Sequence, residues 1–104
     1  MTGIDPQIHP PARLRLMTML TAVSEAEFAT LRDALEVSDS VLSKHVSALA
    51  AAGYVSSRKG VHAGRRTTWI SLTGPGRKAL TAHVAALRAL IDGLDDGASA
   101  VRDH

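Results

Sequence analysis

The stretch from Ser38 to Gly53 constrains the fold most, because its pattern predicts one helix with two unlike faces. Ser38 is a favourable N-cap, since its hydroxyl can accept a hydrogen bond from a free backbone N–H of the first turn. Gly53 suits a left-handed ending of the helix. Leu42, Val46 and Leu49 recur at helical spacing and predict a buried face. The opposite face is small, hydroxyl-rich and basic, and it carries Ser40, Ser43, Lys44 and Ser47.

A hydroxyl-rich, basic face can approach a polyanion closely and donate hydrogen bonds to it. An ordinary amphipathic surface helix would carry the same pattern. Two shorter helices are expected before this one, over residues 12–21 and 29–35. The second is separated from the Ser38 helix by a three-residue turn over 36–38. Two helices joined in this way form a helix-turn-helix, whose second helix can enter the major groove of DNA.

A β-hairpin is expected after the Ser38 helix. Residues 54–59 and 65–72 predict two strands, the second rich in Thr, Trp and Ile, and the glycine-bounded segment 60–64 predicts the turn. Trp69 is interpreted as a core anchor beneath this hairpin. The hairpin is basic at its flanks and tip, where Arg58, Lys59, Arg65 and Arg66 are found.

The last helix is predicted from Pro75 to Ile91 or Leu94, with Thr73 as its N-cap. Its apolar residues step by four and three, which is typical of a helix that pairs with another helix. Residues 98–104 are expected to form a disordered tail. The residues of this apolar seam are Leu80, Val84, Leu87, Ile91 and Leu94.

Charge is segregated along the chain. Residues 40–91 carry eight Lys and Arg and no Asp or Glu, whereas the segments on both sides are acidic on balance. Such a segregated positive field is the usual footprint of a nucleic-acid-binding surface. The alternative is a basic face that only contacts solvent.

The composition excludes several kinds of protein. The 104 residues fit a single domain over 1–104, with an ordered core over 8–94 that must be aliphatic, since aromatics make up only 3%. The absence of cysteine excludes disulfides, thiol catalysis and cysteine-based zinc sites. No stretch approaches the roughly 20 apolar residues of a membrane span, and no signal peptide is recognisable, so we expect a cytoplasmic protein.

Catalytic and metal-binding patterns are also missing from the sequence. The acids lie at the two ends of the chain, and no nucleophile–histidine arrangement or glycine-rich phosphate loop stands out. His83 has no possible metal ligand three or four residues further along its helix. We therefore expect no enzyme, no metal and no cofactor.

The segment from Leu42 to Val55 resembles the recognition-helix signature of the MarR and ArsR superfamily of bacterial transcription regulators. That signature is Leu-Ser-basic-His-aliphatic, then Leu, then Ala-Gly-aromatic-Val. Leu72 to Arg77 is similar to the Leu-Thr-x-x-Gly-Arg sequence of MarR-like proteins, and Ile8 to Arg15 resembles the opening of compact single-domain regulators. The resemblance covers residues 8–91. It implies an α+β, mainly α, winged helix-turn-helix with a three-helix core, a β-hairpin wing and a long C-terminal dimerisation helix.

The resemblance also implies a function: binding of specific double-stranded DNA by a homodimer. We expect a repressor that acts on a near-palindromic operator. The chain is too short for the helices that build the MarR ligand pocket and lacks the cysteine metal sites of many ArsR proteins, so a small-molecule effector is left open. The alternative function is a winged-helix protein-interaction module without specific DNA binding, against which the acid-free segment argues.

The candidate DNA contacts lie on the Ser38 helix and on the hairpin. His45 lies at the edge of the apolar face, where it could reach a phosphate or pack inside against the backbone. Arg65 and Arg66 are expected to contact phosphate or the minor groove. The full set is Ser38, Ser40, Ser43, Lys44, His45, Ser47, Arg58, Lys59, Arg65 and Arg66. The candidate dimer residues are Leu14, Met17 and Leu20 of the first helix with Leu80, Val84, Leu87, Ile91 and Leu94 of the last.

Overall fold

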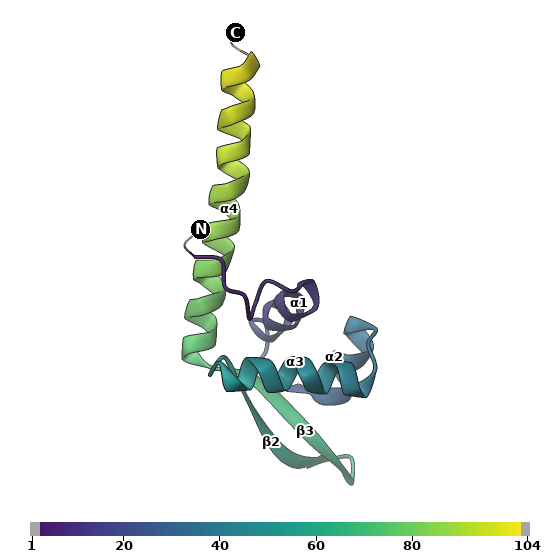
Figure 1. Ribbon diagram of the computed structural model, residues 1–104. Helices are drawn as coiled ribbons and strands as arrows, with labels where there is room; N and C mark the ends of the chain where they lie inside the picture. Colours follow the sequence, from purple (N-terminus) through teal and green to yellow (C-terminus); the bar gives the residue numbers. More distant parts are fainter. Residues whose placement is uncertain (1–2, 103–104) are drawn as a thin grey trace.

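The computed structural model describes residues 3–102, and the side chains of residues 3–94. Three helices form a compact bundle, a β-hairpin projects from one end of it, and a long helix extends in the opposite direction (Figure 1). The predicted α+β, mainly α, fold is therefore confirmed. The elements are α1 (Pro11–Leu20), β1 (Ala26–Glu27), α2 (Phe28–Leu35), α3 (Asp39–Ala51), β2 (Val55–His62), β3 (Arg65–Leu72) and α4 (Gly74–Arg102). None of the described helices has the length and hydropathy needed to cross a membrane.

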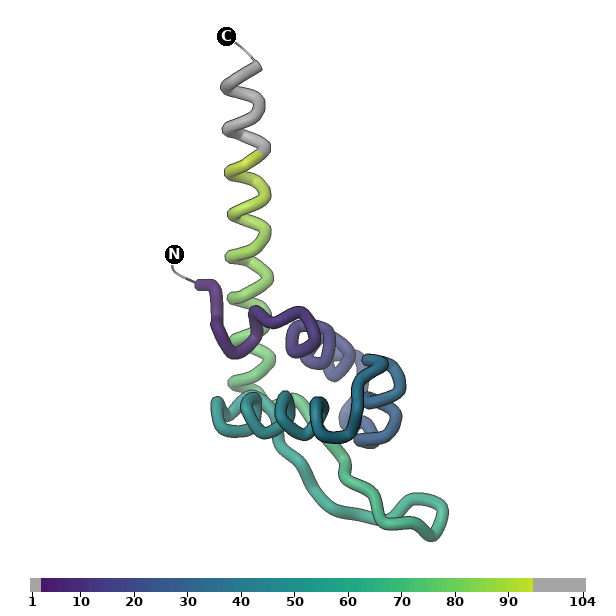
Figure 2. Tube along the Cα trace, turned by 45° about the vertical axis from the view of Figure 1, so that its right-hand side comes forward, coloured from purple at the N-terminus to yellow at the C-terminus, as the bar shows by residue number. Residues whose placement is uncertain are grey.

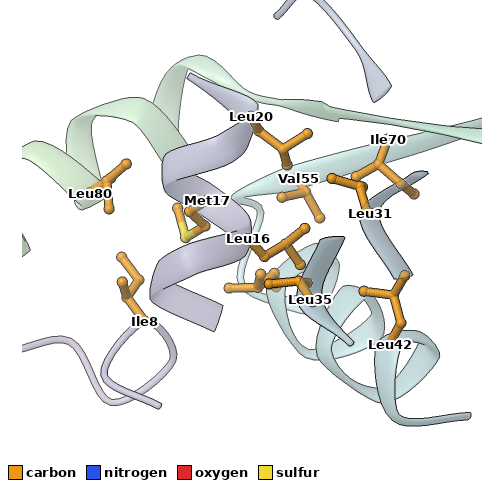
Figure 3. Packing of buried hydrophobic residues seen from close by; sticks show 11 residues of the cluster. Ile8, Leu16, Met17, Leu20, Leu31, Leu35, Leu42, Val55, Ile70 and Leu80 are labelled. Carbon is orange, nitrogen blue, oxygen red and sulfur yellow. The ribbon is translucent and has the colours of Figure 1, made fainter. Parts of the chain in front are cut away.

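The core is aliphatic, as the composition predicted, and it is built around α1. Leu16, Met17 and Leu20 of this helix are completely buried (Figure 3). Side chains from the segment before α1, from every other helix and from β2 and β3 pack around them. These are Ile8, Leu31, Leu35, Leu42, Leu49, Val55, Ile70 and Leu80.

Helix α3 has the boundaries that its sequence predicted. The Ser38 hydroxyl accepts a hydrogen bond from the Val41 backbone N–H at 3.2 Å, so it caps the helix. Gly53, with a φ of 82°, follows the last turn. Leu42 and Leu49 are buried in the core, which turns the hydroxyl-rich face outwards.

The three strands form an antiparallel sheet in the order β1-β3-β2. Strand β2 continues to His62, so the hairpin is longer than predicted, and its turn contains only Ala63 and Gly64. These two residues have φ values of 52° and 77°, as expected for a tight two-residue turn whose twist matches the strands. The expected turn over 60–64 was too long, because Gly60 and Val61 pair with β3 instead.

A tight junction connects the end of α3, the base of the wing and the start of α4. The Thr73 hydroxyl donates to the Gly53 carbonyl at 2.7 Å and accepts from the Gly76 backbone N–H at 2.9 Å, which confirms Thr73 as the N-cap. The Thr73 N–H donates to the Tyr54 carbonyl at 3.0 Å. Gly76 lies so close that an added Cβ would be 2.0 Å from the Tyr54 oxygen. The junction therefore requires glycine at position 76.

The segment that precedes α1 lies along α4 (Figure 2). The Asp5 backbone N–H donates to Nδ1 of the fully buried His83 at 3.0 Å, and the Tyr54 hydroxyl donates to the Asp5 carboxylate. Burial lowers the pKa of His83, and nearby His9 lowers it further. Within the described residues, Nε2 of His83 is buried without a hydrogen-bond partner. His83 is therefore a neutral, structural histidine.

Helix α4 is longer than predicted. It was expected to end at Ile91 or Leu94, but it continues to Arg102. The predicted disordered tail over 98–104 therefore overlaps helical backbone, and its side chains lie outside the described residues. Glycine lowers helix propensity, but neither a proline nor a left-handed cap interrupts the helix at Gly93.

Some of the residues assigned to a dimer interface belong to the core of a single chain instead. Met17 and Leu20 are completely buried, Leu80 is 6% exposed, and Leu14 is partly buried against the same core. Helix α1 is apolar on several sides because the rest of its own chain surrounds it. Among the predicted residues of the α4 seam, Val84 and Leu87 are half-buried, whereas Ile91 and Leu94 are 57% and 74% exposed.

Candidate nucleic-acid interface

The outer face of α3 is open to solvent. Its three serines and its lysine are all exposed. The Ser38 oxygen is used as the helix cap and lies 3.2 Å from Ser40 Oγ, so Ser38 has less freedom to contact a ligand than the other serines. The solvent-facing set is Ser40, Ser43, Lys44 and Ser47.

The one carboxylate at the start of α3 is paired within the chain. Asp39 accepts from the Arg32 guanidinium at 2.9 Å, and Arg32 also pairs with Asp33. The hydrogen bonds to Asp39 and then to Asp33 raise the pKa of Arg32. Asp39 therefore adds little negative charge to the outer face of α3, and the contact fixes α2 against α3.

The wing, formed by β2 and β3, presents basic side chains on both faces. Arg65 and Arg66 are exposed near the turn, and successive residues of a strand point to opposite faces. Lys59 lies on the same face as Arg66, because it pairs with Thr68 in the hairpin. If the wing enters a groove of a nucleic acid, each side of the groove faces at least one positive charge.

Arg58, one of the predicted DNA contacts, is paired within the chain, although its side chain stays 58% exposed. Its guanidinium makes two hydrogen bonds to the Glu25 carboxylate, one of them at 2.9 Å between Nε and Oε2, and it lies 5.5 Å from the centre of the Trp69 ring. These hydrogen bonds lower the pKa of Glu25 and raise the pKa of Arg58. Glu25 therefore neutralises Arg58 and ties β2 to the segment before β1.

Trp69 was predicted to be a core anchor, but it lies on the wing, outside the buried core cluster. Its half-buried ring packs between Arg58 and His62, whose ring lies edge-on at 5.7 Å between ring centres. An added Cβ at Gly60 would be 3.1 Å from the Trp69 ring. Trp69 thus packs across strand β2 from Arg58 to His62.

His45 makes no hydrogen bond to the backbone within the described residues, and its expected contact with a phosphate stays a prediction. It is half-buried, and its Nδ1 accepts a hydrogen bond from Arg13 Nε of α1 at 3.1 Å. Arg13 also donates to the side-chain oxygen of Gln7 at 3.0 Å. Burial, the Arg13 charge and the Lys44 charge lower the pKa of His45, in that order. Arg13 and Gln7 were not recognised in the sequence, since no local pattern pairs residues 32 positions apart.

Helix α3 and the wing lie at the same end of the molecule, opposite the direction in which α4 extends (Figure 1). The structure therefore places α3, with its exposed hydroxyls and Lys44, at the same end of the molecule as the wing, which carries Lys59, Arg65 and Arg66. Within residues 3–94, His, Asp and Glu side chains form no cluster of three or more that could hold a metal ion. The combined surface offers hydrogen-bond donors and positive charge, as recognition of a polyanion requires.

The chain is similar to known proteins over most of its length. Residues 12–91 match a protein-family model described as a winged helix DNA-binding domain. An uncharacterized protein from Methanocaldococcus jannaschii is 31% identical over 72 residues, which are 69% of this chain and 78% of that protein.

Two solved structures extend this similarity to three dimensions. A transcriptional regulator homologue from Pyrococcus horikoshii is 30% identical with a TM-score of 0.79, over 86% of this chain and 88% of that one. A MarR family transcriptional regulator from Streptomyces coelicolor is 26% identical with a TM-score of 0.67, over 82% of this chain and 59% of that one.

Proposed function

The chain belongs to the family of winged helix DNA-binding domains, and we propose that it is a dimeric, sequence-specific transcriptional repressor that acts on a near-palindromic operator. The predicted resemblance to MarR-like regulators is confirmed by the similarity to solved transcriptional regulators. The family model describes a DNA-binding domain, and the two solved structures are described as a transcriptional regulator homologue and a MarR family transcriptional regulator, so we propose a regulator rather than an enzyme.

The observation that carries sequence-specific binding is the outer face of α3. Ser43, Lys44 and Ser47 are exposed on one helix, and the Asp39 carboxylate at its start is held by Arg32. A helix of this kind fits the major groove, where small hydroxyl side chains and lysine can reach base edges. The wing supports this role, because Arg65 and Arg66 can contact the flanking phosphates or the minor groove.

The proposal of a homodimer is supported by the exposed part of α4. Ile91 and Leu94 are exposed where this helix projects beyond the rest of the described chain, and Leu90 beside them is 37% exposed (Figures 1 and 2). Apolar residues arranged at helical spacing in water mark an interaction surface. The interface that we propose contains Val84, Leu87, Ile91 and Leu94, without the core residues Met17, Leu20 and Leu80.

A two-fold dimer predicts the form of the operator. Two copies of α3 related by a two-fold axis would read two half-sites about one DNA turn apart, roughly 34–36 Å. The operator sequence should therefore be a near-palindrome. Selection of bound sequences from a random DNA pool tests specificity and symmetry together.

The decisive test of α3 is a double substitution, Ser43→Ala with Lys44→Ala. Both side chains are exposed, so the fold should be retained while the sequence preference is lost. Arg15→Ala is the control, since it removes one positive charge from α1 while the outer face of α3 stays intact. An unchanged preference in the double variant would refute the assignment of α3 as the reading helix.

The dimer is tested at Leu94, which is 74% exposed in a single chain. Leu94→Glu places a charge in the apolar seam without disturbing the core, and it should give folded monomers that bind DNA poorly. Ala89→Glu introduces the same charge on another face of α4 and should leave the dimer intact. Sedimentation at micromolar concentration measures the outcome. A monomeric wild type with undiminished binding to one half-site would remove the dimer from the mechanism.

A further inference from the structure

His45 lies at the boundary between the two faces of α3. Its neighbours Leu42 and Leu49 are buried and Ser43 and Lys44 are exposed, while the His45 side chain is half-buried. The ring therefore contacts the interior of the protein and the surface proposed to bind DNA. What it can offer to a ligand depends on which ring nitrogen carries the proton.

The contact with Arg13 fixes that proton. The guanidinium of Arg13 is always protonated and has no acceptor, so the nitrogen that receives its Nε–H, at 3.1 Å, must be unprotonated. Nδ1 is thus an acceptor, and a neutral His45 ring must carry its proton on Nε2. In a doubly protonated ring, the N–H at Nδ1 of His45 would face the Nε–H of Arg13, and the two donors would repel each other.

The surroundings of His45 favour the neutral ring. The charged groups near it are Arg13 of α1 and Lys44 of α3, both positive, and burial acts in the same direction. Gln7 accepts from the other side of the Arg13 guanidinium at 3.0 Å and so orients it towards α3. His45, Arg13 and Gln7 form a chain of hydrogen bonds that runs from α3 to α1 and on to the segment before α1.

The other ring nitrogen is available to a ligand. Within the described residues, Nε2 of His45 has no hydrogen-bond partner. It is also not buried, because the one buried side-chain nitrogen or oxygen without a partner in that part of the chain is Nε2 of His83. Nε2 of His45 is therefore open to solvent. His45 therefore presents an N–H donor beside Ser43 and Lys44.

We propose that Arg13 is a positioning residue that holds His45 as a neutral Nε2–H donor, and that His45 donates this hydrogen bond to an acceptor of the bound duplex. The inference rests on the proposed function. The acceptor is a phosphate oxygen or the acceptor edge of a purine, both of which suit a neutral N–H donor.

The state of the ring is measured first, in the free protein. Nitrogen NMR of labelled His45 should show an unprotonated Nδ1 and a protonated Nε2. Arg13→Met removes the donor and the positive charge, so the pKa of His45 should rise, whereas Arg15→Met on the same helix should leave it unchanged. A protonated Nδ1 in the wild type, or the same His45 pKa in Arg13→Met, would overturn the inference.

DNA binding is measured with two substitutions of similar size. His45→Gln keeps an acceptor for Arg13 and an N–H donor towards the duplex, whereas His45→Met keeps neither. For each half-site, His45→Met should bind about 2- to 13-fold more weakly if the acceptor is neutral, and up to about 160-fold more weakly if it is charged. His45→Gln should bind nearly as tightly as the wild type. Equal loss on all sequences identifies a phosphate, and a changed preference at one position of each half-site identifies a base.

Failure of the inference can be told apart from failure of the proposed function. A wild type that binds its site specifically, with His45→Met binding equally well, overturns the role of His45 and leaves the function standing. A wild type that binds no duplex at low salt overturns both. Arg13→Met should also weaken binding with little change in melting temperature, because its contacts lie at the surface.

Discussion

Replacement of Gly76 by alanine tests whether the junction between the wing and α4 has the tight geometry described. The new Cβ would lie 2.0 Å from the Tyr54 oxygen, 2.8 Å from the Tyr54 carbonyl carbon and 2.9 Å from its Cα. All three atoms belong to backbone, so no side chain can rotate away. The methyl group and the carbonyl must therefore separate by at least about 1 Å, to the 3.0 Å below which such contacts essentially never occur.

That movement would strain the hydrogen bonds of the junction. The Tyr54 carbonyl accepts from Thr73, and the Thr73 hydroxyl accepts from Gly76 itself. Loss of one or two such bonds costs about 0.5–1.5 kcal/mol each, and overpacking adds about 1–3 kcal/mol. We expect the free energy of unfolding to fall by about 2–5 kcal/mol. At about 4–8 °C for each kcal/mol, the melting temperature should fall by roughly 8–40 °C.

Urea unfolding followed by circular dichroism measures this change, at one fixed protein concentration because a dimer is stabilised by association. The control is Gly74→Ala in the same turn, where an added Cβ meets nothing within 4 Å. That variant should unfold within about 0.5 kcal/mol of the wild type. If Gly76→Ala is equally stable, the junction is not as tight as the geometry requires and the reasoning fails.

Three further predictions concern the wing and the titrating groups. Arg65→Ala and Arg66→Ala should each lower the slope of log affinity against log salt by up to about one for each half-site, and so by up to about two for the dimer, and a changed consensus sequence would contradict this. Burial holds the pKa of His83 below its unfolded value of about 6.5, so the unfolded chain binds more protons and stability should fall as pH drops below about 6.5. His83→Asn, which keeps an acceptor for the Asp5 N–H, should make that fall shallower, and equal slopes would contradict it. The single tyrosine, Tyr54, should ionise above its ordinary pKa of about 10, because its hydroxyl donates to Asp5 and is partly buried. Spectrophotometric titration measures this directly, and a value of 10 or lower would refute it.

The features that the sequence predicted correctly depend on residues close together in the chain. Ser38 and Thr73 cap helices through groups three residues away, and Gly53 adopts its positive φ at the end of α3. The outer face of α3 follows from helical periodicity alone. Local hydrogen bonding and side-chain spacing determine all of these, so one sequence is enough to find them.

The features that were missed depend on contacts between distant segments. Glu25 neutralises Arg58 across 33 positions, and Arg13 orients His45 across 32. Neither pair has a local signal, so the sequence did not show that Arg58 is paired within the chain. Met17 was assigned to a dimer interface for the same reason, because periodicity shows that a face is apolar but not which surface covers it.

The hydrogen bond between Asp5 and His83 also has a consequence for biosynthesis. It joins residues 78 positions apart, and Ile8, three residues after Asp5, belongs to the same buried cluster as Leu80 of α4 (Figure 3). A ribosome that makes this chain releases the segment around Asp5 long before α4. Until α4 emerges, Ile8 and part of α1 have no cover on that side, while α2, α3 and the wing already have their nearest partners. The proposed DNA-binding elements, α3 and the wing, are therefore synthesised before α4. Folding of the domain is completed only when α4 has been synthesised.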